Sequence, residues 1–115
     1  MSAITTHVLD VTRGRPAANI PVLLEVQESS GAEWRPIGRG TTDTDGRLRS
    51  LLPDGEPLLV GVYRLVFNTA QYFAAAGVDA FYPRVIIEFE TTPGETHYHV
   101  PLLLSPFGYS TYRGT

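Results

Sequence analysis

The sequence predicts an all-β fold, a β-sandwich of two antiparallel sheets with Greek-key connections and one short helix. The chain has 115 residues, 43% of them hydrophobic, which suffices for one core but not two, so residues 1–115 are expected to form a single domain. Short segments with strand-like alternation lie between frequent turn signals rich in Gly, Pro, Asp and Ser. The clearest turn signals lie at residues 13–16, 29–31, 45–46, 53–55, 93–94 and 105–106.

Seven segments are predicted as strands from their alternation and their β-branched and aromatic residues. The first alternates around Thr5, His7 and Leu9, and the second, PVLLEVQE, reads as a half-buried strand, as does the third. The next three contain the runs VYRLVFN, RVIIEFE and THYHVPLLL. The last is short, but its aromatic and β-branched residues indicate that it pairs with a neighbour. In chain order the predicted strands are residues 4–10, 21–28, 34–41, 62–68, 84–90, 96–104 and 109–112.

One short helix is predicted at residues 69–76, where the Ala-rich run TAQYFAAA interrupts the strand pattern. Asn68 or Thr69 can cap its N-terminus. Gly77 can end it, because glycine readily takes the left-handed conformation that closes many helices. We expect the two aromatic residues of this run to pack the helix onto the sandwich.

Strand alternation assigns a face to the histidines. In residues 96–104 a row of Tyr, Val, Leu and Leu marks the core side, so His97 and His99 point away from the core. In the first strand, His7 faces outward if the row of Ile4 and Val8 faces the core. These outward rows, with a polar row of the last strand, could line one groove if the strands are neighbours.

Two interpretations of the histidines stay open from the residues alone. A single outward histidine on a strand is most often a solvated residue, and His7 alone would be no more than that. His97 and His99 have a spacing that could present two imidazoles to one ligand, and with His7 they would form a three-histidine zinc set. Spacing of this kind has low specificity.

The two candidate arginines have ordinary explanations. Arg47 follows the tight turn at residues 43–46, and from spacing alone it is a solvated residue beside a hairpin. Arg113 lies where a frayed tail is the default, but its segment, STYRGT, reads as a strand that pairs. If these residues carry out chemistry, histidine would act as acid and base and arginine would stabilise charge.

Composition excludes several classes of partner. The net charge is −3, and the nine basic residues are all arginine with no clustered positive face, which argues against nucleic acid binding. No apolar stretch approaches the ~18 residues of a membrane span, and the start, MSAITTHVLD, lacks the features of a secretory signal. Without cysteine there is no disulfide framework and no Cys-based zinc site. We expect a cytoplasmic protein that binds neither nucleic acid nor membrane.

Several motifs resemble the transthyretin-like protein family, over essentially the whole chain. They are His7-Val8-Leu9-Asp10 followed by Gly14-x-Pro16-Ala17, Thr44-Asp45-Gly46-Arg47, Phe81-Tyr82-Pro83 and the run HYHVPLLLSPFGYSTYRG. The family has two branches, transthyretin, which carries hormone and retinol-binding protein, and 5-hydroxyisourate hydrolase, an enzyme of urate breakdown. An N-terminal His, an Arg after Asp-Gly, the second His of His-x-His and a C-terminal Tyr-Arg-Gly-Ser mark the hydrolase branch.

The resemblance places this chain with the hydrolases, although Thr115 stands where the pattern has Ser. It implies no metal and no cofactor. The catalytic residues that it implies are His7, Arg47 and His99. The substrate-binding residues that it implies are His7, Arg47, Tyr112, Arg113 and Thr115. Because threonine keeps the hydroxyl group, we expect activity to survive at that position.

The resemblance also implies an assembly and a reaction. The expected assembly is a homotetramer, a dimer of dimers with its sites in the channel between dimers. The expected reaction is opening of the cyclic amide of 5-hydroxyisourate to 2-oxo-4-hydroxy-4-carboxy-5-ureidoimidazoline. His7 and His99 would position and deprotonate water and then protonate the departing nitrogen, and Arg47 would stabilise the charged oxygen.

Three other functions stay open. A carrier would use the same channel to bind an aromatic ligand without turnover. A zinc hydrolase would use His7, His97 and His99, and an interaction module would be a monomer with neither ligand nor turnover. The histidines and the Tyr-Arg-Gly run argue against the carrier, because an apolar ligand channel gains nothing from imidazole and guanidinium groups.

Overall fold

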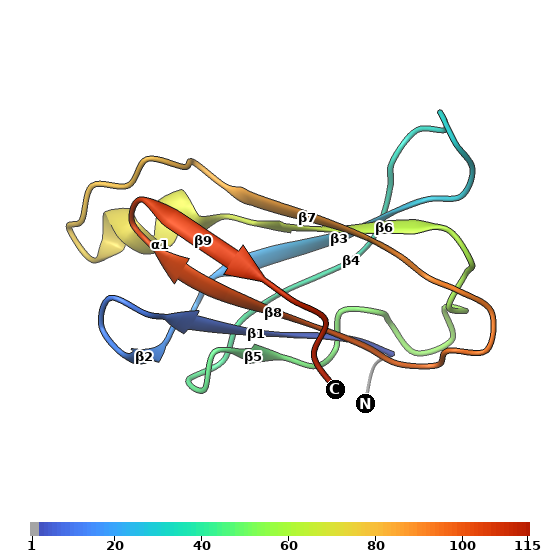
Figure 1. Ribbon diagram of the computed structural model, residues 1–115, viewed down its shortest axis with the longest axis horizontal. Helices are drawn as coiled ribbons and strands as arrows, with labels where there is room; N and C mark the ends of the chain where they lie inside the picture. The colour runs from blue at the N-terminus through green and yellow to red at the C-terminus, as the bar shows by residue number, and fades with distance from the viewer. Residues whose placement is uncertain (1–2) are drawn as a thin grey trace.

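The computed structural model describes residues 3–115, which form two sheets packed face to face with one helix at an end of the sandwich (Figure 1). Sheet A contains β1 (Ile4–Asp10), β2 (Arg15–Pro16), β5 (Arg47–Leu48), β8 (Tyr98–Ser105) and β9 (Gly108–Thr111). Sheet B contains, in spatial order, β4 (Arg35–Thr41), β3 (Pro21–Gln27), β6 (Val62–Phe67) and β7 (Val85–Glu90). The helix is α1 (Thr69–Ala75). The predicted all-β sandwich is therefore confirmed.

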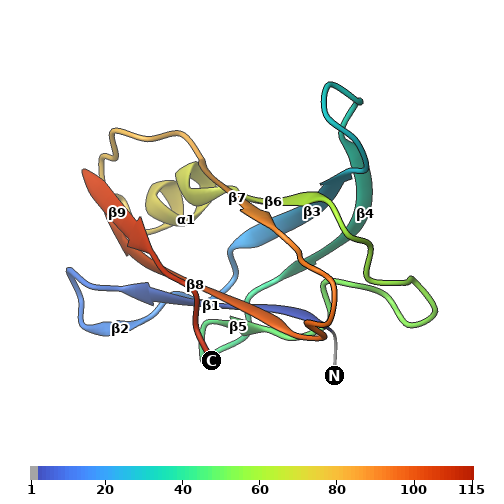
Figure 2. The same cartoon turned by 45° about the vertical axis from the view of Figure 1, so that its right-hand side comes forward.

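Sheet A has the order β2-β1-β8-β9, and β5 also pairs with β1. The β1–β8 pair is parallel, whereas the other strand pairs among the described residues are antiparallel. Parallel neighbours need a long crossover, because the chain must return to the same end of the sheet. Here the whole of sheet B lies on that crossover, so the first and penultimate strands of the chain lie side by side (Figures 1 and 2).

The core fills the space between the sheets with the inward rows of their strands. Alternate residues are fully buried along β3 and β6, as expected for strands with one apolar face. Each such side chain contributes on the order of 1.5–3 kcal/mol by leaving water. The largest fully buried side chains include Tyr63, Phe67, Ile4, Ile20, Leu24, Leu51, Leu65, Leu102 and Leu104.

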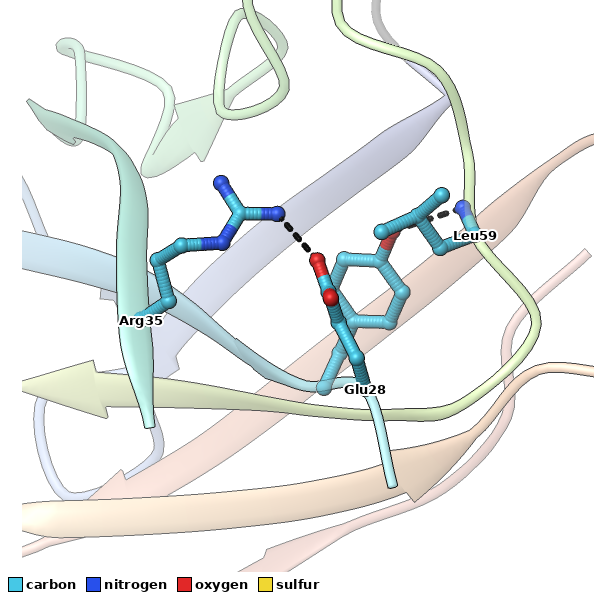
Figure 3. A network of polar contacts seen from close by, with 4 residues as sticks. Glu28, Arg35 and Leu59 are labelled. Atoms are coloured by element: carbon cyan, nitrogen blue, oxygen red, sulfur yellow. Dashed lines mark hydrogen bonds and ion pairs between the residues drawn. The ribbon is translucent and has the colours of Figure 1, made fainter. Parts of the chain in front are cut away.

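Tyr63 is buried together with its polar end, which needs a partner. Its hydroxyl oxygen accepts a hydrogen bond of 2.9 Å from the backbone N–H of Leu59, and burial raises the pKa of this phenol. Figure 3 shows this contact beside the ion pair between Arg35 and Glu28, whose N···O distance is 2.6 Å. That pair is solvent-exposed and joins the ends of β3 and β4, whereas the satisfied phenol lets an aromatic ring occupy the core.

The helix follows the prediction closely. The Asn68 side chain accepts a hydrogen bond of 3.2 Å from the backbone N–H of Gln71, which makes Asn68 the N-cap. Gly77 follows the helix with a φ of +69°, the left-handed conformation expected of the residue that ends it. Phe73 is buried, and the Tyr72 hydroxyl donates to the Asp10 carboxylate at 2.8 Å, so both aromatic residues attach the helix to the sandwich.

The first predicted strand has the same bounds as β1, and the boundaries of the other predicted strands differ by one or two residues, with one consequence for the histidines. The segment predicted at residues 96–104 becomes a strand only at Tyr98, because the ladder with β1 begins with the pair Ile4 and Tyr98. His97 therefore lies in the loop before β8, and its predicted place on the strand is wrong. His99 is in the strand, half-buried on the outward side as predicted.

Two strands of two residues each, β2 and β5, escaped prediction because they are too short to show alternation. Hydrogen bonds from the backbone to one side chain stabilise the turn before β5. The Asp43 carboxylate accepts them from the backbone N–H groups of Asp45 and Arg47, at 2.9 and 3.0 Å. These hydrogen bonds lower the pKa of Asp43, with the Arg47 N–H as the largest cause. The Gly46 carbonyl then accepts from the Val8 N–H at 2.8 Å, which attaches the turn to β1.

Gly46 is predicted to be essential to this attachment. Its φ is +75°, and a Cβ at this position would overlap the Val8 carbonyl oxygen. Gly14 is a matched control, because its φ is +67° but a Cβ there meets no atom within 4 Å. Gly14→Ala should cost about 1–2 kcal/mol of unfolding free energy from the left-handed conformation alone. Gly46→Ala should cost at least about 1 kcal/mol more, from the steric overlap. Denaturant unfolding measures both, and equal losses would contradict the prediction.

Candidate active site

The outer face of sheet A collects the predicted catalytic residues. In the β1–β5 pair His7 lies opposite Arg47, and in the β1–β8 pair Thr5 lies opposite His99. Residues opposite one another on paired strands share a face, and residues two apart on one strand do too. These four residues therefore occupy one face, while the intervening row of β1 is buried in the core. The predicted outward orientation of His7 and His99 is confirmed, and their two strands are neighbours, as a shared surface requires.

The end of the chain completes this face. After β9 it passes across β8 toward β5 (Figures 1 and 2), and the Gly114 N–H donates a hydrogen bond of 2.8 Å to the His99 carbonyl. This bridge makes the end of the chain an additional short partner of β8. A pocket of ≈ 250 Å³ lies here, lined by Thr5, Thr6, Arg47, Arg49, His97, His99 and Thr115.

The His99 ring is held from two sides. Its Nδ1 is 2.8 Å from the hydroxyl oxygen of Thr5, which is itself buried. On the other side the ring lies against Gly114, where a Cβ would come within 2.6 Å of the His99 Cδ2. Glycine is therefore required at position 114 for close approach to the ring, and the ring is oriented by a hydrogen bond and by packing.

Electrostatics keep this imidazole uncharged at neutral pH. The pKa of His99 is lowered from its ordinary value of 6.5, first by partial burial and then by the positive charge of Arg47, with smaller contributions from His7 and His97. A neutral imidazole has one N–H donor and one acceptor nitrogen, while the nearby guanidinium groups offer fixed positive charge. The pocket can thus exchange a proton with a substrate and stabilise negative charge on oxygen.

Three residues of the pocket, Thr5, Thr6 and Arg49, were missed by sequence reasoning, and Thr6 belongs to the core row of β1. Thr5 lies on the same outward row as His7, and Arg49 lies two residues after Arg47, so alternation was a signal for both. Neither stood out, because the β5 strand was not recognised and an outward threonine is common. His7 itself is half-buried beside Arg47 in the ladder but does not line the pocket.

The structure does not bring Tyr112 and Arg113 into this pocket within one protomer. They line a second pocket of ≈ 250 Å³, which shares His99 with the first. The Arg113 guanidinium lies 4.9 Å from the ring centroid of Tyr98 and 3.4 Å from the Glu95 carboxylate. Tyr98 belongs to the core row of β8, so Arg113 is directed to the opposite side of that strand from His99. Their roles in substrate binding stay predictions.

Other possible sites lack comparable chemistry. Within residues 3–115 no three His, Cys, Asp or Glu side chains are grouped to hold a metal ion, so His7, His97 and His99 do not converge on one point. A larger concavity of ≈ 640 Å³ on sheet B has two arginines, Arg39 and Arg84, but neither histidine nor carboxylate in its lining. In the described part of the chain no helix has the length and apolarity to cross a membrane.

The lowered pKa of His99 predicts a pH dependence of stability. Between that pKa and the ordinary 6.5, the unfolded chain binds more protons than the folded one. The free energy of unfolding therefore decreases as the pH falls through this window. His99→Asn removes this contribution and retains an acceptor for Thr5. Denaturant unfolding at about pH 7.5 and about pH 5.5 should show a larger loss for the wild type than for the variant. Equal losses would refute the prediction, since the carboxylates are common to both.

Comparison with known proteins identifies the family. Residues 4–114 match the model of the HIUase/Transthyretin family. A protein of Salmonella typhimurium named 5-hydroxyisourate hydrolase is 43% identical over 112 residues, 97% of this chain and 80% of the relative. The structure of Klebsiella pneumoniae 5-hydroxyisourate hydrolase aligns with a TM-score of 0.83 and 33% identity, covering 99% and 100% of the two chains. The structure of sea bream transthyretin in complex with thyroxine aligns with a TM-score of 0.88 and 30% identity, covering 98% and 95%.

The family model spans nearly the whole chain, and both kinds of neighbour share its sandwich. This chain therefore belongs to the HIUase/Transthyretin family.

Proposed function

We propose that the protein is a 5-hydroxyisourate hydrolase, which opens the cyclic amide ring of its substrate with water in urate degradation. The relatives that carry this name support the proposal. The observation that carries it is the register of sheet A, which sets His7 beside Arg47 and Thr5 beside His99 on one outer face. The backbone alone does not separate the two branches, because sea bream transthyretin aligns as well as the hydrolase does.

The chemistry required is addition of water to an acyl carbon followed by cleavage of its bond to a ring nitrogen. The water must lose a proton, the carbonyl oxygen gains negative charge, and the departing nitrogen must gain a proton. Two imidazoles, one of them held neutral by its surroundings, can manage the proton and the hydrogen bonds to the reacting atoms. This division of work needs no metal and no cofactor.

Arg47 is suited to stabilising the negative charge that develops on the carbonyl oxygen. It lies directly opposite His7 in the β1–β5 ladder, and its planar guanidinium can donate two parallel hydrogen bonds to a flat ligand with several oxygens. Arg49 in the same pocket adds a second positive charge, which favours an anionic intermediate. The reaction product, 2-oxo-4-hydroxy-4-carboxy-5-ureidoimidazoline, carries a new carboxylate that these groups would also attract.

The proposal includes assembly as a homotetramer with sites in a channel between dimers, and a cytoplasmic location. The site of a single protomer is a shallow, open surface, and Tyr112 is 58% exposed beside it. A second dimer facing sheet A would exclude water from this surface, which strengthens every charge interaction there. It would also supply a wall against which Tyr112, Arg113 and Thr115 could contact the substrate.

The deciding experiment follows the decay of freshly generated 5-hydroxyisourate with and without the protein, in the presence of a chelator. Clear acceleration that His99→Ala abolishes supports a metal-free hydrolase. Decay at the spontaneous rate would overturn the proposal and favour a carrier like the thyroxine-binding neighbour. Activity that chelation removes and zinc restores would favour the zinc alternative.

His7→Ala and His99→Ala are each predicted to lower kcat by about 10²-fold or more, because each removes a group that acts on protons at the reacting atoms. Both side chains lie on the outer face, outside the core row, so the fold should persist. Steady-state kinetics measure the loss, and light scattering checks that each variant keeps the wild-type oligomeric state. Turnover near that of the wild type in either variant would remove that residue from the mechanism.

Gly114→Ala is predicted to lower kcat, about 10-fold or more, by pushing the His99 ring from its position. The added Cβ would lie 2.6 Å from the ring, whereas a Cβ at Gly108, on β9, meets one side-chain atom at 3.8 Å. Gly108→Ala is therefore the matched control and should keep wild-type turnover. Equal activity of the two variants would show that close packing at Gly114 does not position His99.

A further inference from the structure

The side-chain hydroxyl group of Thr5 has one hydrogen-bond partner among residues 3–115, the His99 ring. The distance from its hydroxyl oxygen to Nδ1 is 2.8 Å, and Thr5 is only 4% exposed. A buried hydroxyl group both donates and accepts, and leaving its proton without an acceptor is costly. The direction of this hydrogen bond therefore follows from where the hydroxyl proton of Thr5 can go.

The other hydroxyl groups of the sandwich indicate that direction. Four threonines donate their hydroxyl proton to a backbone carbonyl at 2.6–2.8 Å, namely Thr6 to Val100, Thr42 to Ala17, Thr91 to Leu59 and Thr111 to Pro101. Thr5 faces no carbonyl but an imidazole nitrogen, whose lone pair is its one acceptor in the described residues. Thr5 thus donates to Nδ1, and a neutral ring with an unprotonated Nδ1 carries its proton on Nε2.

The same contacts orient the rest of the ring. Nδ1 and Cδ2 are the two ring atoms bonded to Cγ, and they lie against Thr5 and Gly114 respectively. With both of these sides covered, the outer edge of the ring, formed by Cε1 and Nε2, is the part left for the pocket that His99 lines. The Nε2–H group is accordingly the polar group that His99 offers to a ligand.

We propose that Thr5 is a positioning residue that holds His99 in the Nε2–H tautomer, so that His99 donates a hydrogen bond to the carbonyl oxygen under attack. This inference rests on the proposed hydrolase function and divides its proton chemistry between the two histidines. His7 takes a proton from water as the water oxygen bonds to the acyl carbon. His7 then returns that proton to the ring nitrogen as the carbon–nitrogen bond breaks.

The charge state of His99 fits this donor role. Burial and the Arg47 guanidinium lower its pKa and keep it neutral, and a neutral imidazole that gave its proton away completely would become an unfavourable imidazolate. It therefore keeps the proton and stabilises the charged oxygen through the hydrogen bond, as other preorganised donors do. His7 has no such hydroxyl partner in the described residues, so its ring is not held in one tautomer in this way.

The tautomer is tested directly by NMR on the intact protein with 15N-labelled histidine at about pH 8, well above the lowered pKa of His99. Comparison with His99→Asn assigns the His99 signals. We expect the shifts of an unprotonated Nδ1 and a protonated Nε2. A ring with the proton on Nδ1 would overturn the inference, and this readout does not depend on the substrate.

Kinetics test the consequence with a pair of variants. Thr5→Val keeps the shape of the side chain but lacks the hydroxyl, and should lower kcat by about 10-fold or more, as loss of an imidazole's orienting partner does. It should leave KM nearly unchanged, while Thr5→Ser keeps the hydroxyl and should retain most of the wild-type kcat. The matched control is Thr91→Val, which also loses a buried hydroxyl that donates to a carbonyl, but away from the pocket.

The outcomes separate this inference from the proposed function. If the wild type fails to accelerate decay of 5-hydroxyisourate, the function is wrong, and the NMR result still decides the tautomer. If the wild type is active but Thr5→Val keeps its tautomer and its kcat, the function stands and the role of Thr5 is refuted. Should Thr5→Val fold poorly, the wild-type spectrum and the Thr5→Ser kinetics give the same decision.

Discussion

The parallel pairing of β1 with β8 is the constraint on which the core and the site both depend. Seven residue pairs, from Ile4 with Tyr98 to Asp10 with Leu104, set the register of this ladder. One row of each strand fills the core, and the other row forms the outer face with His7 and His99. A slip of one residue would exchange the two rows, exposing apolar residues and burying histidines. Burial of the core row therefore fixes the position of the site as a consequence of folding.

Strand alternation was sufficient to predict which way these side chains point, but not which residues of different strands share the face. The orientation of His99 followed from the strongly apolar core row of β8. The orientation of His7 followed from Ile4 and Val8, although the buried Thr6 and Asp10 belong to the same row. Which strands are neighbours is a long-range property, since β1 and β8 are separated by the whole of sheet B. The role of Arg47 beside His7 depends on a strand of two residues, too short for any local pattern. The resemblance to a family supplied what periodicity alone lacked.

The site is also where the chain departs from the most stable local choices. A positive guanidinium stands near an imidazole whose pKa it lowers, which favours a neutral ring. Glycines at positions 46 and 114 leave room for a carbonyl oxygen and for an imidazole, where a larger residue would have filled space. Such departures are expected where structure serves chemistry, because stability alone would favour better packing and separated charges.

This separation of faces explains how one fold can support both a carrier and a hydrolase. The chain aligns with sea bream transthyretin at a TM-score of 0.88 and with a hydrolase at 0.83, so the backbone does not distinguish their functions. In a strand, successive side chains belong to opposite faces, so outer residues can change while the core row and the register stay the same. Function must then be argued from the outer face itself. On this chain that face carries two histidines, Arg47 and a hydroxyl group directed at a ring nitrogen, which are groups suited to moving protons and stabilising charge, and not to holding an apolar ligand.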